Sequence, residues 1–128
     1  MLLKRIRQEP NSVIYYPVFH REIEESIAAE GVVPPEVELV IAEGNYLLHP
    51  SDGWGGVREL LDHSWYVDVD DKMRIERLIQ RRLGDGYTHE EAVHWTAGSD
   101  EVNAQVIGRT RSSADVVVAI GALTPESH

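Results

Sequence analysis

Cysteine is absent from the 128 residues, and the chain has only two lysines and one phenylalanine. Without cysteine it forms neither disulfides nor thiolate metal sites, which favours a reducing compartment such as the cytoplasm. No run of about 18 apolar residues occurs, so no transmembrane helix is predicted. The basic first residues lack the apolar stretch of a signal peptide. We therefore expect a cytoplasmic protein with no membrane partner.

Positive charge is also scarce, because the net charge is −10. An acidic protein does not attract a phosphate backbone non-specifically, so we expect no nucleic-acid partner. The segment 71–111 differs from the rest, since it carries seven basic and seven acidic side chains and is neutral. Its arginines predict either a solvated helix face with ion pairs or an anion site, because a planar guanidinium suits phosphate.

Two kinds of motif are missing as well. The chain contains neither G-x-x-x-x-G-K-[ST] nor G-x-G-x-x-G, and neither Lys4 nor Lys72 follows a glycine. These 128 residues therefore encode no glycine-rich phosphate cradle. His89 and His94 are five residues apart and miss the four-residue spacing of a helical zinc pair, so no zinc site is predicted.

The order of the predicted elements favours a single α/β domain over residues 1–128, with a largely parallel sheet flanked by helices. Hydrophobic residues make up 42% of the chain, enough to bury a core. An apolar run at 38–42 is typical of a strand buried on both faces. Pro17 is expected to end the first strand, and 21–29 to form a short helix or an irregular loop. Further strands are predicted at 13–16, 64–69 and 115–120, and helices at 2–7, 57–61, 71–83, 89–97 and 100–111.

The segment 71–111 is predicted to contain a helical lid, because it holds more helices than one crossover needs. Asp70 is a good N-cap for its first helix, and Gly84 stands where a left-handed C-terminal residue is expected. Thr88 and Glu91 match a capping box, which begins a second helix. These signals set the predicted ends of the first two lid helices.

Glu43 is the first candidate site residue, because it directly follows the predicted buried strand at 38–42. In open α/β sheets, ligands bind beyond the carboxyl ends of the strands. Gly44 permits close backbone approach and Asn45 adds a neutral hydrogen-bonding group. A carboxylate there suits Mg²⁺ held through water, although it would also serve simply to cap the following turn.

Arginines and one histidine complete the candidates. Arg81 and Arg82 near a helix end either complement the helix dipole or clamp phosphate on a mobile lid. His20 follows a strand and Pro17, so it is read either as a surface residue or as a substrate contact. Spacing alone leaves both alternatives open.

With these motifs set out, the chain resembles the P-loop small-molecule kinases. The group comprises uridine kinase, phosphoribulokinase and pantothenate kinase, and the likeness is greatest to its bacterial nucleoside/nucleotide kinase-like members. The resemblance covers nearly the whole chain. It rests on Tyr-Pro-Val-Phe-His-Arg at 16–21, Val-Ile-Ala-Glu-Gly-Asn-Tyr-Leu-Leu at 40–48, Trp54, Trp-Tyr-Val-Asp-Val at 65–69, Arg-Leu-Ile-Gln-Arg-Arg at 77–82, Gly-Ser-Asp-Glu-Val-Asn-Ala at 98–104 and Ala-Asp-Val-Val-Val at 114–118.

The resemblance implies roles for these residues. Glu43 matches the glutamate that helps bind Mg²⁺, while Arg77, Arg81 and Arg82 match the region whose arginines meet the ATP phosphates. The substrate-side matches are His20 and Arg21, in a motif that is usually Phe-Asp-Arg, together with Asn45. Asp100 and Asn103 match a polar motif that is usually Asn-Asp-x-x-Asn. This chain departs from the family with His20 in place of aspartate and Ser99 in place of asparagine.

Family members carry a strand, a P-loop, a helix and a second strand before the point where this chain starts. That piece holds the ATP phosphates and an aspartate that serves as catalytic base. Its first strand normally lies between the strands matched here by 39–42 and 64–69. The resemblance thus implies a P-loop-kinase-like three-layer fold missing its first strands, and we expect a truncated part of a longer protein. Exposed sheet edges would then favour pairing of two chains as a homodimer.

The implied function is that of the C-terminal part of an ATP-dependent kinase, which phosphorylates a hydroxyl of a small metabolite such as a nucleoside, a sugar or a pantothenate-like molecule. ATP and Mg²⁺ would serve the intact parent, and none would bind tightly to these residues alone. Because the P-loop does most of the work of phosphoryl transfer, the fragment is expected to be inactive, and no residue is assigned as catalytic. The alternatives are a non-catalytic binding or assembly module that retains the kinase fold, and a small protein of unrelated function.

Overall fold

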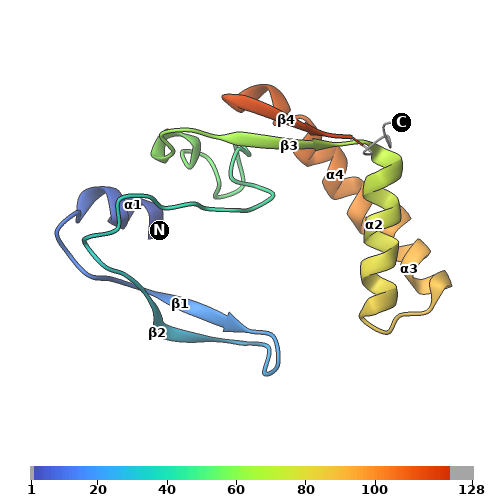
Figure 1. Cartoon of the computed structure of the whole chain (residues 1–128), viewed down its shortest axis with the longest axis horizontal. Coiled ribbons are helices and arrows are strands. Elements are labelled where there is room, and N and C mark those ends of the chain that lie inside the picture. The colour runs from blue at the N-terminus through green and yellow to red at the C-terminus, as the bar shows by residue number, and fades with distance from the viewer. Residues whose placement is uncertain (1, 122–128) are drawn as a thin grey trace, which may run out of the picture.

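Residues 2–121 are described by the structure, a computed structural model, and they trace an open arc (Figure 1). A hairpin forms one arm of the arc, a parallel strand pair spans its top, and three helices descend on the other side. No helix in this range combines the length and the apolar character that crossing a membrane requires. The elements are α1 (Leu2–Gln8), β1 (Ile14–His20), β2 (Glu25–Val33), a 3₁₀ turn (Arg58–Leu60), β3 (Trp65–Val69), α2 (Asp71–Gly84), α3 (His89–Trp95), a π-helical turn (Thr96–Asp100), α4 (Glu101–Gly108), a second 3₁₀ turn (Arg111–Ser113) and β4 (Val116–Ile120).

The β1–β2 hairpin corrects two predictions. Pro17 was expected to end the first strand, yet β1 continues through it to His20. The segment 21–29 is neither a helix nor an irregular loop, because a turn leads directly into β2. The two strands pair antiparallel, and their register shifts between Tyr16 and Val18. A proline fits at such a bulge, where its missing N–H costs no ladder hydrogen bond.

The apolar run at 38–42 is extended but belongs to no strand, so the prediction of a buried strand there is wrong. Leu39 is 75% exposed and Ile41 is 84% exposed. The physical reason is the lack of a neighbour, since no strand within residues 2–121 pairs with this run. Strand formation and burial both need a partner, which an apolar sequence alone does not supply.

We predict that Ile41→Lys leaves the unfolding free energy of this chain within about 0.5 kcal/mol of wild type, because the side chain is already exposed. Chemical unfolding followed by circular dichroism measures the change. Ala92→Lys is the matched control, since Ala92 is fully buried and a lysine there should destabilise the helical segment strongly. A loss of more than about 2 kcal/mol in Ile41→Lys would contradict the exposed placement.

The β3–β4 pair confirms the two predicted strands and their parallel direction. Trp65 pairs with Val116 and Val69 with Ile120 in an unbroken register. Burial is a different matter, because Trp65 is 67% exposed and Val67 is 56% exposed. Among the described residues, the fully buried apolar side chains are only Ile14, Val57 and Ala92, so the expected continuous core is not formed within them.

Local signals predicted where α2 and α3 begin, but they did not predict where α2 ends, and the helix expected at 57–61 is only the 3₁₀ turn Arg58–Leu60. Asp70 caps α2, accepting hydrogen bonds from the backbone N–H of Lys72 at 3.0 Å and of Met73 at 3.2 Å. The capping box that Thr88 forms with Glu91 is present at the start of α3. Gly84, by contrast, is the last residue of α2, and the left-handed glycine lies two residues later at Gly86, with φ 91°.

The helical segment continues from α3 into α4 without a loop. The π-helical turn Thr96–Asp100 joins them, and Gly98 within it departs from helical geometry. The helix predicted at 100–111 is accordingly shorter, spanning Glu101–Gly108. The role of 71–111 as a lid stays a prediction.

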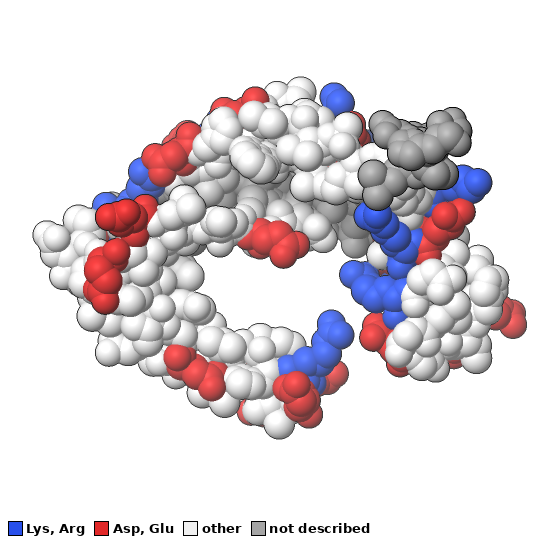
Figure 2. Space-filling view, in the orientation of Figure 1, with Lys and Arg blue, Asp and Glu red and all other residues white. Residues whose placement is uncertain are grey.

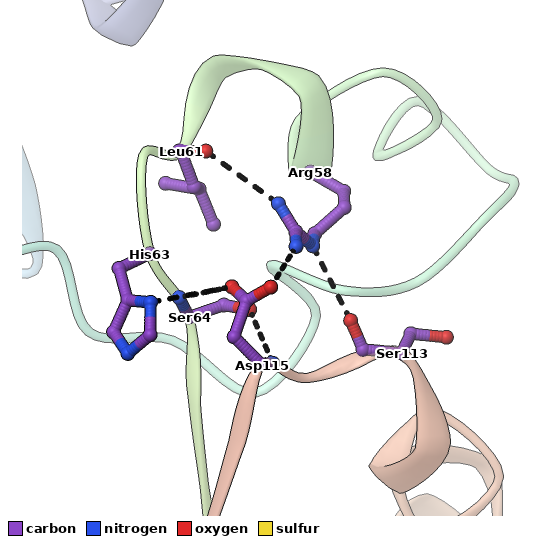
Figure 3. A network of polar contacts seen from close by, with 6 residues as sticks. All are labelled: Arg58, Leu61, His63, Ser64, Ser113 and Asp115. Atoms are coloured by element: carbon purple, nitrogen blue, oxygen red, sulfur yellow. Dashed lines mark hydrogen bonds and ion pairs between the residues drawn. The ribbon is translucent and has the colours of Figure 1, made fainter.

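A polar network holds the N-terminal ends of β3 and β4 together (Figure 3). The carboxylate of Asp115 accepts hydrogen bonds from the backbone N–H and the hydroxyl of Ser64, both at 2.7 Å. Its other oxygen, Oδ1, accepts from Arg58 Nη2 at 2.5 Å, while His63 Nδ1 lies 3.8 Å from the Oδ2 that Ser64 binds. These contacts fix the register of the parallel pair from three separate segments of the chain.

The network predicts a pH dependence of stability. Hydrogen bonds from the Ser64 side chain and backbone, helped by the charge of Arg58, lower the pKa of Asp115. A carboxyl whose folded pKa is depressed stabilises the fold above its unfolded pKa, about 3.9, and loses that contribution as pH falls through the folded pKa. We expect Asp115→Asn to be less stable than wild type near pH 6, with the difference shrinking below about pH 4.

Thermal unfolding of both proteins across this pH range measures the effect. Asp52→Asn, which changes an exposed loop carboxylate, is the matched control and should not alter the pH profile. A difference between wild type and Asp115→Asn that stays constant down to about pH 2 would contradict the assignment.

Candidate functional site

An open cavity of about 1570 Å³ lies on the inner side of the arc. The segment 37–45, β3, α2 and α4 contribute its walls. Figure 2 shows the hollow, with basic side chains gathered on its helical side. Of the nine predicted site residues, six line this cavity: Glu43, Asn45, Arg77, Arg81, Asp100 and Asn103.

Glu43 and Asn45 lie where the exposed apolar run turns. Glu43 is exposed, and a tight turn begins at Asn45. A Cβ added to Gly44 would lie 3.4 Å from the Leu47 side chain, an ordinary contact distance. Within residues 2–121 no three His, Asp or Glu side chains gather to hold a metal. Glu43 is thus the one carboxylate that this turn offers to a cation, and a single carboxylate suits only an ion that keeps most of its waters, as Mg²⁺ does.

Arg77 and Arg81 form the basic part of the cavity wall. They are four residues apart on α2, so both project from the same side of the helix. Both are exposed, and neither forms an ion pair with another described residue. Two unpaired guanidinium groups one turn apart suit a polyanion such as a phosphate chain.

Arg82 is held differently from its two neighbours. Its Nη2 donates to Asp100 Oδ2 at 2.8 Å, and the two side chains are only 18% and 22% exposed. The guanidinium carbon lies 5.9 Å from the ring centre of Tyr87 and 5.8 Å from that of Trp95. Arg82 does not line the cavity. It ties α2 to α3 and to the π-helical turn, whereas its predicted role at ATP phosphates is untested.

The cavity also contains residues that sequence reasoning missed. Arg74 bridges Glu101 at 2.6 Å and Asp71 at 3.1 Å, and these bonds, chiefly the one to Glu101, raise the pKa of its guanidinium and link α2 to α4. The three-residue spacing from Asp71 to Arg74 was the signal available in the sequence. Its contact with Glu101 could not be read from the sequence.

Asn103 is tied to the loop that follows Glu43. The hydroxyl of Tyr46 donates to Asn103 Oδ1 at 2.9 Å, and the Tyr46 and Trp54 rings lie 5.9 Å apart. The loop 45–56 is thereby attached to α4 across the cavity. This contact positions Asn45 and Asn103 on the same site, although they are far apart in the sequence.

His20 and Arg21 are not brought to this cavity. His20 ends β1 and contacts Glu30 on β2, with His20 Nε2 and Glu30 Oε2 2.5 Å apart. Arg21 begins the hairpin turn and is exposed. The tip of the hairpin faces the helical side across the open part of the arc (Figure 1).

The chain is similar in sequence and in structure to several proteins that are named as kinases. No family model matches the chain. It is 27% identical over 115 residues to an ATP-dependent kinase-like protein, notR', of Aspergillus versicolor, which covers 86% of this chain and 67% of that protein. A solved structure from Silicibacter sp. TM1040, named a fructose transport system kinase, is similar with a TM-score of 0.75 and 32% identity.

A second solved structure shares the fold at lower identity. It is YFH7 from Saccharomyces cerevisiae, named a P-loop containing kinase with a circular permutation, and it matches with a TM-score of 0.68 and 23% identity. The matches cover 90% and 84% of this chain, but only 58% of the Silicibacter chain and 35% of YFH7. The chain thus spans about two thirds or less of the length of each of these proteins.

Proposed function

We propose, from the premise that this chain is a relative of the P-loop kinases, that it forms the C-terminal part of an ATP-dependent kinase acting on a hydroxyl of a small metabolite. The acceptor is a nucleoside, a sugar or a pantothenate-like molecule. ATP and Mg²⁺ serve the intact parent, and these 128 residues alone transfer no phosphoryl group.

The cavity is the observation that carries this proposal. It gathers an exposed carboxylate, Glu43, two arginines without an ion pair to any described residue, Arg77 and Arg81, and the polar side chains of Asn45 and Asn103. Phosphoryl transfer depends mainly on positioning and on charge stabilisation, and these groups suit both tasks. Bound Mg²⁺ would supply charge neutralisation for the phosphates. Glu43 would hold the ion through water, while Arg77 and Arg81 would bind the phosphate oxygens.

The edges of the cavity support a longer parent protein whose sheet contains one more strand at this place. Within residues 2–121, Leu39 and Ile41 project from an extended segment that pairs with no strand, and β3 pairs with β4 alone. Both unpaired edges line the same cavity. An apolar strand between them would bury these side chains and complete a parallel sheet. In the family this is the strand that leads into the P-loop.

Two proteins expressed from the gene, one longer and one of these 128 residues, test the proposal. The longer one, extended upstream in frame, should transfer phosphate from ATP to at least one of uridine, fructose and pantothenate. The 128-residue chain should transfer none and should bind ATP more weakly than micromolar by calorimetry. An in-frame stop codon directly upstream, or tight ATP binding by the short chain, would count against the proposal.

The exposed apolar edge also favours the second candidate, a non-catalytic assembly module. In that case two chains would pair through Leu39–Ile41 and β3 as a homodimer, because unpaired edges promote strand addition. Light scattering of wild type and of Ile41→Lys distinguishes the kinase proposal from the assembly module. A dimer abolished by Ile41→Lys, with no activity in the longer protein, would favour the assembly module.

A further inference from the structure

The β1–β2 hairpin has an irregular register at its centre. Between Tyr16 and Val18 the register shifts, and β2 has two more residues than β1 across this shift. Pro17 lies opposite the extra residues. Ala29, one of them, has φ 59°, in the left-handed region that alanine rarely adopts. Strained backbone of this kind is concentrated at functional sites.

The bulge brings Glu30 against His20. Their side chains meet at 2.5 Å between Nε2 and Oε2, and are 35% and 40% exposed. Glu25 is the residue directly opposite His20 in the ladder, yet it forms no ion pair with His20 in the described hairpin. The strained segment therefore places Glu30 against His20, although Glu25 is the ladder partner of His20.

The contact sets the chemistry of the imidazole. A neutral imidazole carries its proton on one nitrogen only, and a carboxylate accepts hydrogen bonds. Glu30 therefore favours the proton on Nε2 and leaves the lone pair on Nδ1. Within residues 2–121, His20 Nδ1 has no hydrogen-bond partner. A carboxylate that orients a histidine in this way prepares the other nitrogen to accept a proton or a hydrogen bond.

We propose that Glu30 is a positioning residue, which fixes His20 as the Nε2–H tautomer so that Nδ1 accepts a hydrogen bond from the hydroxyl of the acceptor substrate. The inference rests on the proposed kinase function, because that reaction needs an oriented hydroxyl. No covalent step is assigned to His20. The hairpin tip faces the arginine-bearing helix across the open arc, which suits an acceptor held opposite the phosphate donor (Figure 1).

Nitrogen NMR of the 128-residue chain tests the positioning directly. Long-range ¹H–¹⁵N spectra at about pH 8, where histidine is neutral, distinguish a protonated from an unprotonated ring nitrogen. Wild type should show His20 with Nε2 protonated and Nδ1 unprotonated. Glu30→Ala should bring the two resonances together, because both tautomers become populated.

Two variants distinguish an effect on the His20 tautomer from an effect on folding. Glu30→Gln keeps an oxygen acceptor and should restore most of the wild-type signature, while Glu25→Gln should leave it unchanged. A wild-type His20 that already averages both tautomers would overturn the proposal. So would a signature that depends on Glu25 and not on Glu30.

Titration with uridine and with fructose tests the hydroxyl contact. At least one probe should shift His20 Nδ1 in wild type, and Glu30→Ala should weaken that binding about twofold, because only the molecules that keep the Nε2–H tautomer are then competent to bind. If neither probe moves Nδ1, the substrate contact is overturned. Failure of the kinase proposal would appear separately, as absent transfer by the longer protein with the tautomer signature intact.

Discussion

Arg82→Ala is expected to destabilise the helical segment by about 2 kcal/mol, because it leaves the Asp100 carboxylate without its partner in a mostly buried site. The loss of the two cation–π contacts with Tyr87 and Trp95 adds to the effect. This expected loss of stability is smaller than for a fully buried ion pair, since about a fifth of each side chain is exposed. The melting temperature, followed by circular dichroism, should fall by about 8 °C.

A double-mutant cycle shows whether the pair itself is responsible. Arg82→Ala, Asp100→Ala and the double variant should give a coupling of about 1 kcal/mol or more, because the two side chains are in direct contact. Arg77→Ala is the matched control on the same helix and should leave the melting temperature unchanged. Additive losses in the cycle would show that Arg82 acts through its aromatic neighbours alone.

The double variant Arg77→Ala, Arg81→Ala is expected to lower the kcat/KM of the proposed longer kinase about 100-fold or more. Groups that stabilise the charge of a transferring phosphoryl group are typically worth that much each. Both side chains line the cavity and lie exposed without ion pairs to described residues. Their removal should therefore leave the stability of the fold unchanged while activity falls.

Steady-state kinetics with ATP and the best acceptor measures this effect. Arg109→Ala is the matched control, since Arg109 is exposed but does not line the cavity. Near-wild-type kinetics of the double variant would remove these arginines from the phosphate site. A fall that Arg109→Ala reproduces would point to net charge and not to position.

The ends of the helices were predictable because their causes are local. Asp70 caps α2 and Thr88 caps α3 with groups only two or three residues away. The four-residue spacing of Arg77 and Arg81 likewise fixes their common side of α2. The left-handed glycine was misplaced from Gly86 to Gly84, since the helix runs one residue further than its apolar pattern suggests.

The hairpin escaped prediction because its cause is not local. Pro17 indicates a strand end when read alone, and β1 passes it only because β2 bulges opposite. Gly31 shows how close the two strands come, since an added Cβ would clash with the Tyr16 ring. The contact between His20 and Glu30 depends on that bulge and has no sequence signal of its own.

The sequence by itself determined the α/β class, the capped starts of α2 and α3, the parallel direction of β3 and β4, and the residue types of the proposed phosphate site. Each of these follows from periodicity, capping or chain order within a short stretch. Only the tertiary structure decided that Leu39 and Ile41 are exposed, that Arg82 binds Asp100 while Arg77 and Arg81 face the cavity, and that Glu30 meets His20. The physical reason is that burial and pairing depend on neighbours distant in the chain, which no local pattern specifies.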